Sequence, residues 1–390
     1  MLPLALLTHS ACTPTTALAD CTGSACVNGT CACDAGWTGA RCAEAALGPA
    51  TRAFTMPHTW LWGAAPARSS SNRYYAFAMA LKNRCGIYHY RHNSYIVRGT
   101  ATSPLGPFDY DGVALDNRTA PLFDAVEVED PNLVALPGGA GYLLFYAGSA
   151  FPSPLPPGNH TAHLNCTASD VPDSDSQMLA EGNRIGVAFA PSLDAPFTAL
   201  PDPVLRTRPG HWDSTRVSNP AALVFANGTT LLLYRGNGAD PRHGNGIGVA
   251  RAPHWSGPYE TLLEAPLFDG YAEDPTLFVG PNGVLHMLAH GELRSAGATG
   301  VGIHSVSTDG VRWTPPVTSY TTDVVWAAGQ ENVSLGRRET PELLLGDDGQ
   351  PAFLFNSAAP CGCYYGKHDP RCNWGDDCRS FSMAAPFLRT

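Results

Sequence analysis

The sequence predicts an all-β protein, a five-bladed β-propeller preceded by a small N-terminal disulfide-rich module. Forty glycines and 34 prolines among 390 residues separate short apolar runs, a pattern typical of strands joined by turns. A strand–turn–strand unit recurs along most of the chain, and a third strand with its own signature follows it. Five copies of such an antiparallel meander predict five blades that bury their faces against one another.

Most copies of the repeat open on a proline, and the residues before that proline vary from copy to copy. The openings are Glu129-Asp130-Pro131, Ser218-Asn219-Pro220, Glu273-Asp274-Pro275 and Glu339-Thr340-Pro341, with a degenerate first copy at Ala65-Pro66. A β-sandwich, the alternative fold, does not require so regular a recurrence. Because the chain stops soon after Phe381-Ser382-Met383, we expect an N-terminal strand near Phe54–Trp62 to complete the last blade.

These patterns divide the chain into a module over residues 12–42, a linker over 43–53 and a propeller over 54–390. Residues 1–19 are compatible with a signal peptide, since Met1–Leu7 is apolar and Ala17-Leu18-Ala19 suits a signal peptidase. Cleavage there would remove Cys12 and leave an odd number of cysteines in the module.

The composition restricts the compartment and the partners. A formal net charge of -10 argues against nucleic acid as a partner, and no run of 18 apolar residues predicts a transmembrane segment. Twelve cysteines indicate an oxidising compartment, so we expect a secreted or cell-surface protein. The predicted glycosylation sites are the six N-x-S/T sequons, at Asn28, Asn117, Asn159, Asn165, Asn227 and Asn332.

The N-terminal cysteines follow the spacing C-x4-C-x4-C-x-C-x8-C from Cys21 to Cys42, with Gly36-Trp37-Thr38-Gly39 before the last one. This segment resembles an EGF-like module of the tenascin kind. The resemblance implies the pairs Cys12–Cys26, Cys21–Cys31 and Cys33–Cys42, and a role as a spacer or as a contact for an extracellular protein. A metal site is disfavoured, because no zinc-like C-x2-C pair is present.

The remaining cysteines lie mostly near the C-terminus and predict disulfide-stapled loops. They are Cys361, Cys363, Cys372 and Cys378, with Cys85 and Cys166 as further partners. Six cysteines permit 15 pairings, among which the sequence does not choose. Residues 151–178, rich in Pro, Ser and Asp, predict a surface loop on the second blade.

The propeller resembles the five-bladed glycosidase superfamily of arabinanases, β-xylosidases, levansucrases and invertases. The resemblance rests on the Asp-Pro openings, the Gly-Pro-aromatic turns after the third strands, and Arg337-Arg338-Glu339-Thr340-Pro341. It implies an active site at one mouth of the channel, with acids from the first three blades. By position the first-blade base falls at Ala65, the second-blade acid at Asp130 or Glu129, and the third blade offers Asn219 and Ser218.

Hydrolysis of a glycoside needs two carboxyl groups, one protonated and one ionised. If each inner strand starts at its proline, the acidic pairs converge on the axis, although only one residue of each pair faces the channel. The other aspartate or glutamate would bond backbone N–H groups. The candidate catalytic residues are Asp130, Glu273, Asp274 and Glu339. The candidate substrate-binding residues are Glu129, Arg216, Asn219, His290 and Arg338.

The residues predict no cofactor and no catalytic metal, although His290 could help to hold a structural calcium ion in the channel. The leading prediction is a secreted glycoside hydrolase-like propeller that acts on an extracellular polysaccharide or glycan. The alternative is a catalytically inactive module that binds a glycan or serves adhesion. The separation of the channel carboxylates discriminates between them, because hydrolysis requires two within about 10 Å.

Overall fold

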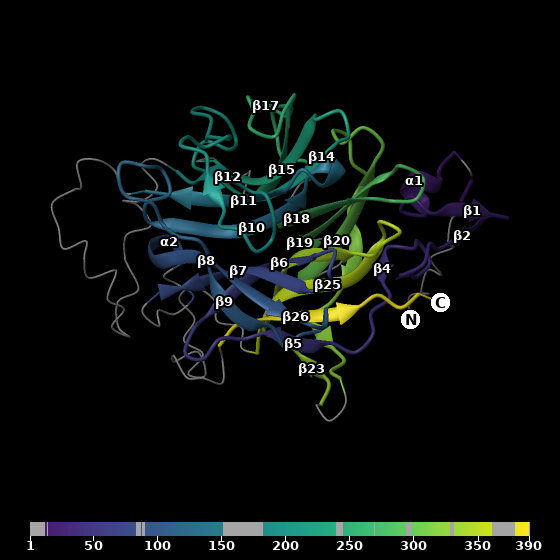
Figure 1. Cartoon of the computed structure of the whole chain (residues 1–390). Coiled ribbons are helices and arrows are strands. Elements are labelled where there is room, and N and C mark those ends of the chain that lie inside the picture. Colours follow the sequence, from purple (N-terminus) through teal and green to yellow (C-terminus); the bar gives the residue numbers. More distant parts are fainter. Residues whose placement is uncertain are drawn as a thin grey trace, which may run out of the picture.

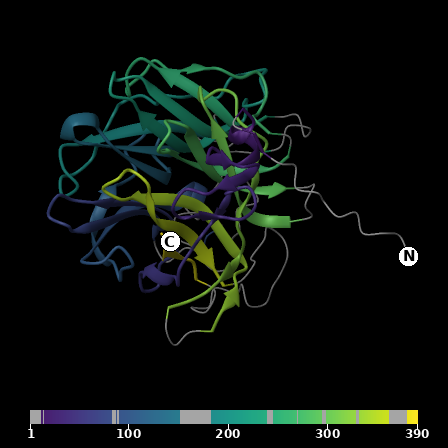
Figure 2. The same ribbon diagram turned by 90° about the vertical axis from the view of Figure 1, so that its right-hand side faces the viewer.

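The computed structural model describes residues 12–13, 15–82, 87, 90–150, 182–238, 245–268, 270–293, 298–327, 331–360 and 379–389. Five four-stranded antiparallel sheets follow one another along the chain, which confirms the five-bladed propeller (Figure 1). Viewed as in Figure 2, their colours succeed one another around a common centre.

In blades 1 to 4 the strands run outward from the centre in chain order. Blade 1 contains β6 (Leu61–Arg68), β7 (Tyr74–Leu81), β8 (Ser94–Ala101) and β9 (Asp109–Leu115). Blade 2 contains β10 (Glu127–Ala135), β11 (Tyr142–Ser149), β12 (Arg184–Ala190) and β13 (Thr198–Ala199). Blade 3 contains β14 (Arg216–Val224), β15 (Thr230–Asn237), β16 (Gly246–Ala252) and β17 (Glu260–Thr261). Blade 4 contains β18 (Ala272–Val279), β19 (Leu285–Leu293), β20 (Ala298–Ser307) and β21 (Val317–Tyr320).

Blade 5 is built from both ends of the chain. Its inner strands are β24 (Arg337–Leu345), β25 (Pro351–Ala359) and β26 (Phe381–Pro386), and its outer strand is β5 (Thr51–Phe54). Ser382 pairs with Phe54, and β5 lies beside β26 in Figure 1. The closing strand therefore exists as expected but lies just upstream of the predicted range. Closing the ring in this way pairs an edge that would otherwise be open.

The innermost strands β6, β10, β14, β18 and β24 contact one another in a ring. Each is interrupted by a β-bulge at the same level. The bulged residue has a positive φ in every blade: 56° at Gly63, 52° at Asp130, 46° at Asn219, 53° at Asp274 and 46° at Thr340. Such angles strain most residues, while glycine, asparagine and aspartate tolerate them best. The repeated unit is therefore a bulge, which a proline follows in four of the five blades.

The alignment of the first blade on Ala65-Pro66 is wrong. The bulge lies between Trp62 and Ala64, so Gly63 is the counterpart of Asp130 and Ala64 stands where the other blades have proline. Glycine reaches the positive φ without a supporting side chain, and this blade does not keep the proline at that place. The position expected for a first-blade acid is thus Gly63.

The blades bury apolar side chains between their faces. Blades 2 and 3 each also contain a buried Tyr–Asp–Arg hydrogen-bonded group. Tyr146 donates to Asp124 over 2.6 Å, and Tyr234 donates to Asp213 over 2.8 Å. Arg118 and Arg208 pair with the same two aspartates. Asp213, which lies just before β14, is thereby satisfied in the wall of its blade.

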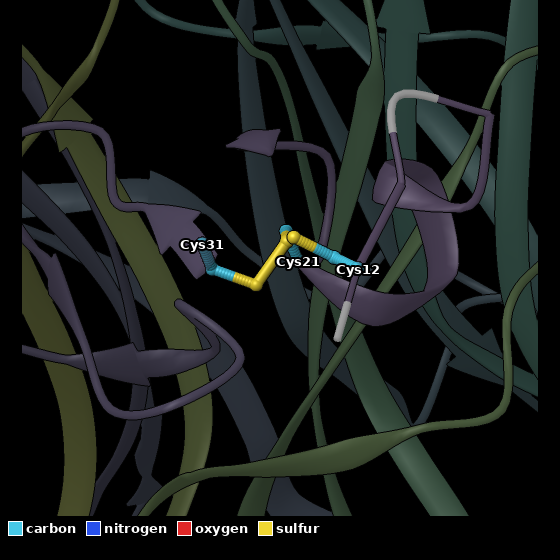
Figure 3. A group of neighbouring side chains, drawn as sticks. All are labelled: Cys12, Cys21 and Cys31. Carbon is cyan, nitrogen blue, oxygen red and sulfur yellow. A yellow bond between two sulfur atoms is a disulfide. The ribbon is translucent and has the colours of Figure 1, made fainter. Parts of the chain in front are cut away.

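The N-terminal module contains α1 (Ala17–Asp20), β1 (Ala25–Val27), β2 (Thr30–Ala32), β3 (Trp37–Thr38) and β4 (Glu44–Ala45). Its disulfides are Cys12–Cys26, Cys21–Cys31 and Cys33–Cys42, which confirms the three predicted pairs. Figure 3 shows Cys12 close to the bridge between Cys21 and Cys31. The range 43–53, expected to be a linker, contains β4 and most of β5.

The other secondary elements are short. They are α2 (Tyr90–Asn93), the 3₁₀ helix η3 (Pro137–Gly139), β22 (Asp323–Val324) and β23 (Val333–Ser334). Among the described residues no helix has the length and apolarity to cross a membrane. Some predictions fall outside the described residues: those for Cys85, Cys166, Cys361, Cys363, Cys372, Cys378, Asn159, Asn165 and residues 151–178. Of the other sequons, Asn28, Asn227 and Asn332 are exposed, and Asn117 donates to the Ser94 carbonyl over 2.9 Å.

Candidate active site

Just before its bulge, each inner strand brings two side chains to one mouth of the channel. Residues two apart on a strand share a face, so the period-2 pattern places these pairs side by side. The pairs are Trp60 and Trp62, Glu127 and Glu129, Arg216 and Ser218, Tyr271 and Glu273, and Arg337 and Glu339. Blades 2, 4 and 5 thus supply the acids of this mouth, whereas the resemblance implied blades 1, 2 and 3.

Glu273 is buried and surrounded by groups that favour its ionised form. Arg235 Nη1 lies 2.8 Å from Glu273 Oε2, the Tyr271 hydroxyl donates to the same carboxylate, and His290 Nδ1 lies 3.5 Å from Oε1. Burial alone would raise the pKa of Glu273, but Arg235, with smaller contributions from His290 and Tyr271, holds that pKa well below its usual value. Glu273 is therefore an anion at any working pH.

His290 lies opposite Glu273 on β19 and is 3% exposed. Burial lowers the pKa of His290, but the charges of Glu339, Glu273 and Asp274 raise it to about 9. Neither ring nitrogen has a hydrogen-bond partner among the described residues, so the contact with Glu273 is an ion pair. The predicted channel histidine thus contributes a positive charge to this mouth.

Glu339 completes a compact group with Glu273, Asp274 and His290. One ligand atom of each of the four lies within 4.8 Å of the others. Arg337 donates to both carboxylate oxygens of Glu339, over 2.8 and 2.9 Å. Hard cations such as calcium take carboxylate oxygens, so the three carboxylates are the groups that could hold the ion considered from the sequence, whereas a protonated His290 is not a ligand.

Glu129, on blade 2, has the opposite environment. Burial raises its pKa well above the usual value, and the neighbouring charges of Asp130 and Glu127 raise it further. Asn183 donates to Glu127 over 2.6 Å and accepts from Arg216 Nε over 3.0 Å. The arginine expected to bind substrate is thus bonded to a neutral amide, and its charge acts to lower the pKa of Glu129 but is outweighed by burial and the two neighbouring acids.

The bulged residues form a hydrogen-bonded chain across four neighbouring blades. The Asn219 backbone N–H donates to Asp130 Oδ2 over 3.2 Å, and the Asn219 amide donates to Asp274. Asp274 Oδ2 in turn accepts from the Thr340 N–H over 3.1 Å. The aspartates expected to be catalytic therefore bind backbone groups of the next blade, the alternative foreseen for one member of each acidic pair. The ring encloses a cavity of about 20 Å³, enough for a water molecule and too small for a sugar.

Below the bulges lies a carboxyl group that the sequence analysis missed. Glu342 accepts from Asn132 over 3.2 Å and from Thr276 over 3.4 Å. Its remaining exposure is to the narrow channel cavity, which it lines. Burial raises the pKa of Glu342 to about 8, although the two donors act to lower it.

Arg338, predicted to bind substrate, does not lie in the mouth. Its guanidinium donates to Asn356 over 3.0 Å and to the Thr321 carbonyl over 2.9 Å, between blades 4 and 5. Strand alternation turns Arg338 away from the face that Arg337 shares with Glu339. Arg235 was missed because it comes from the second strand of blade 3 and reaches Glu273 on the next blade.

The comparison with solved structures agrees with this architecture. A family 117 glycoside hydrolase, Zg3597 from Zobellia galactanivorans, superposes with a TM-score of 0.60 at 15% identity, covering 88% of this chain and 90% of that one. The fold is that of the glycoside hydrolase propellers. An α-L-arabinofuranosidase from Lactobacillus brevis gives a TM-score of 0.52 at 12% identity, covering 85% and 92%.

A third structure, fructan 1-exohydrolase IIa from Cichorium intybus, gives a TM-score of 0.54 at 12% identity, covering 85% of this chain and 56% of that one. No protein-family model and no curated protein sequence matches the chain. At these identities the likeness shows the fold alone, so a function has to be argued from the residues of the mouth.

Proposed function

We propose that the protein is a secreted glycoside hydrolase that cleaves an extracellular polysaccharide or glycan at this mouth. The observation that carries the proposal is the opposed environment of two buried carboxyl groups in one site. Burial and like charges raise the pKa of Glu129, which favours its protonated form, while Arg235 lowers the pKa of Glu273, which favours its ionised form. Carboxyl groups whose pKa values are driven apart in this way are the usual acid and its ionised partner in glycoside hydrolysis.

In this assignment Glu129 is the general acid, which donates its proton to the glycosidic oxygen as the leaving group departs. Glu273 is the ionised carboxylate that stabilises the positive charge developing on the sugar, and it either attacks the anomeric carbon or activates water there. Glu339 lies beside Glu273, with an oxygen of each within 4.8 Å. Two channel carboxylates thus lie within the 10 Å that the sequence analysis required, although this pair does not include Glu129, the acid of the assignment.

The arginines orient the acids. Arg235 and Arg337 each hold one carboxylate in place, which fixes the geometry before the substrate binds. The imidazolium of His290 adds a further positive charge beside Glu273, which disfavours transfer to Glu273 of the proton that Glu129 must keep for the leaving group. Asp130 and Asp274 support the site through the bulge ring.

The test uses purified protein and a panel of plant and algal polysaccharides, with reducing ends measured. Glu129→Gln and Glu273→Gln should each lower kcat by at least 100-fold, the range of one acid–base group. Glu260→Gln, an exposed carboxylate on β17, is the matched control. Aryl glycosides with an activated leaving group need little help from a general acid, so they should restore the activity of Glu129→Gln far more than that of Glu273→Gln. Unchanged activity in both variants would overturn the assignment.

A specific observation favours a second candidate, a propeller that binds a glycan without cleaving it. Among the described residues, blade 1 presents Trp60, Trp62 and Gly63 at the mouth, where the related fold would be expected to place its base. Tryptophan stacks well on sugar rings. Retention of the wild-type protein on an immobilised polysaccharide that it does not hydrolyse, lost in Trp62→Ala, would support this candidate against the first.

A further inference from the structure

Trp37 of the N-terminal module packs on blade 4, where α1 and β4 of the module also contact β20 and β21. The Trp37 ring stacks on Phe278 with 6.0 Å between ring centroids and 3° between planes, and it lies 4.3 Å from the His304 ring. The Phe387 and His286 rings also surround Trp37, with centroid distances of 5.5 and 6.4 Å. Figure 2 shows the purple module in front of the green and yellow blades. The contact lies at the β18–β19 turn end of the blade, away from the acidic mouth.

Beneath Trp37, two buried histidines connect the blade to the module. His304 Nδ1 lies 3.1 Å from the Ala43 carbonyl, and His286 Nδ1 lies 2.9 Å from His304 Nε2. A carbonyl only accepts, so His304 carries its proton on Nδ1 and accepts at Nε2, and His286 donates from Nδ1. The arrangement uses two neutral rings, and a proton added to His304 Nε2 would face the N–H of His286.

A charge on either ring would be unpaired. Neither imidazole has a carboxylate partner in the described part of the chain, and burial lowers the pKa of His286 to about 4 and that of His304 well below its usual value. The charged or titratable groups on the packed strands are Glu273, Asp274, His290 and Glu292 on β18 and β19, Tyr320 and Asp323 near β21, and Arg337, Arg338, Glu339 and Glu342 on β24. On the module and the C-terminal segment they are Asp20, Asp34, Arg41, Glu44 and Arg389. Arg337 pairs with Glu339, Arg338 bonds Asn356, and Glu342 accepts from Asn132 and Thr276. Arg41 bonds the Ala19 carbonyl, Arg389 bonds Asp348, and Glu273 and Asp274 lie at the opposite end of β18.

We propose that the His286–His304 pair is an acid-sensitive latch, which holds the module on blade 4 when both rings are neutral and releases it when they take up protons. Release would free the Trp37 face of the module, which the propeller covers in the docked state. The proposal does not depend on the proposed hydrolysis, because the latch and the acidic mouth lie at opposite ends of the inner strands.

The pH dependence of docking is set by the difference in histidine pKa between the docked and undocked states. An undocked, solvated histidine titrates near 6.5, and His286 titrates near 4 when docked. Docking is therefore strongest above about pH 6.5 and weakens as the pH falls toward 4, by up to tenfold per pH unit for each histidine. Across that window His286 alone weakens docking by about 300-fold.

The experiment follows Trp37 in the full chain labelled with 5-fluorotryptophan, using ¹⁹F NMR from pH 7.5 to 4 and Trp37→Phe to assign the resonance. The Trp37 signal should move to its exposed position below pH 6.5, while the other tryptophan signals stay dispersed. His286→Asn keeps a donor at the Nδ1 position and cannot be protonated, so its transition should be shallower and shifted to lower pH. His254→Asn, an exposed histidine, is the control and should behave as wild type.

Two outcomes would overturn the latch. One is a Trp37 signal that keeps its buried position down to pH 4, or moves only together with all other tryptophans as the propeller unfolds. The other is an identical transition in wild type and His286→Asn. If His286→Asn is undocked at every pH, His286→Gln, whose longer amide also donates, is titrated instead and must show the same reduced pH dependence.

Discussion

Replacing Glu342 by glutamine should make folding less sensitive to alkaline pH. Glu342 is enclosed by the inner strands with Asn132 and Thr276 as donors, and burial raises its pKa from 4.5 to about 8. A carboxyl group whose pKa is raised on folding stabilises the fold fully below its unfolded pKa. That contribution is lost as the pH rises from about 4.5 to 8, because the unfolded chain can ionise there and the folded chain cannot.

The magnitude follows from the two pKa values. Over such a window the stability difference between variant and wild type changes by about 1.4 kcal/mol per pH unit. Between pH 5.5 and 7.5 the wild type should therefore lose about 2 kcal/mol relative to Glu342→Gln, after a small allowance for channel water. The glutamine amide can still accept from Asn132 and donate to Thr276, so no hydrogen bond is sacrificed.

The assay is scanning calorimetry of both proteins at pH 5.5, 6.5 and 7.5 with the disulfides intact, converting the difference in Tm with the measured unfolding entropy. Glu260→Gln, an exposed carboxylate, is the control and should show no trend. A difference between Glu342→Gln and wild type that stays constant across this range would show that Glu342 ionises in the channel, and the reasoning from burial would be refuted.

Three more predictions follow from the ring, the mouth and the module. Asp274→Ala should lower the free energy of unfolding in urea by about 2–3 kcal/mol, and Asp274→Asn by less than about 1 kcal/mol. Alanine loses the acceptor for the Thr340 N–H of the next blade and tolerates the φ of 53° poorly. Equal losses in the two variants would contradict this. Arg235→Met should move the acidic limb of the kcat/KM profile to higher pH, since Glu273 loses the cation 2.8 Å away; an unmoved limb would count against it. Removing the Cys33–Cys42 bridge should destabilise the module by about 2–3 kcal/mol, with faster hydrogen exchange confined to residues 12–45.

The repeat made the fold predictable, and the bulge explains where the prediction failed. Alternating short strands and turns predicted the blade count, and the resemblance to an EGF-like module implied the three disulfides. The first blade was aligned on a proline, although the repeated requirement is a positive φ. Gly63 meets that requirement without a proline after it. A search for residues that tolerate positive φ would have found the right register.

The site was only partly predictable, because its contacts cross between blades. Glu127 could have been found from the sequence, since it lies two residues before Glu129 on the same strand face. The same alternation would have excluded Arg338. Arg235 could not have been found, because its distance from Glu273 depends on how blade 3 packs on blade 4. The protonation of Glu129 likewise depends on burial, which the sequence pattern does not measure.

The mouth contains more buried acid than the fold requires. Blade 3 makes the same bulge with Ser218 and Asn219, so neither Glu129 nor its neighbour is needed for the backbone geometry. Burying a carboxyl group without a cation costs stability, and the raised pKa of Glu129 records that cost. Residues kept at the expense of stability are typical of functional sites.

This reasoning predicts the sign of one stability change. At pH 7.5 Glu129→Gln should be more stable than wild type, since burial raises the pKa of Glu129 and glutamine cannot ionise in the unfolded chain. It should at the same time have lost hydrolysis. Calorimetry and the polysaccharide assay on one preparation measure both. A less stable Glu129→Gln would mean that this carboxyl group serves the structure of blade 2, and the argument from excess acid would then support no catalytic role for it.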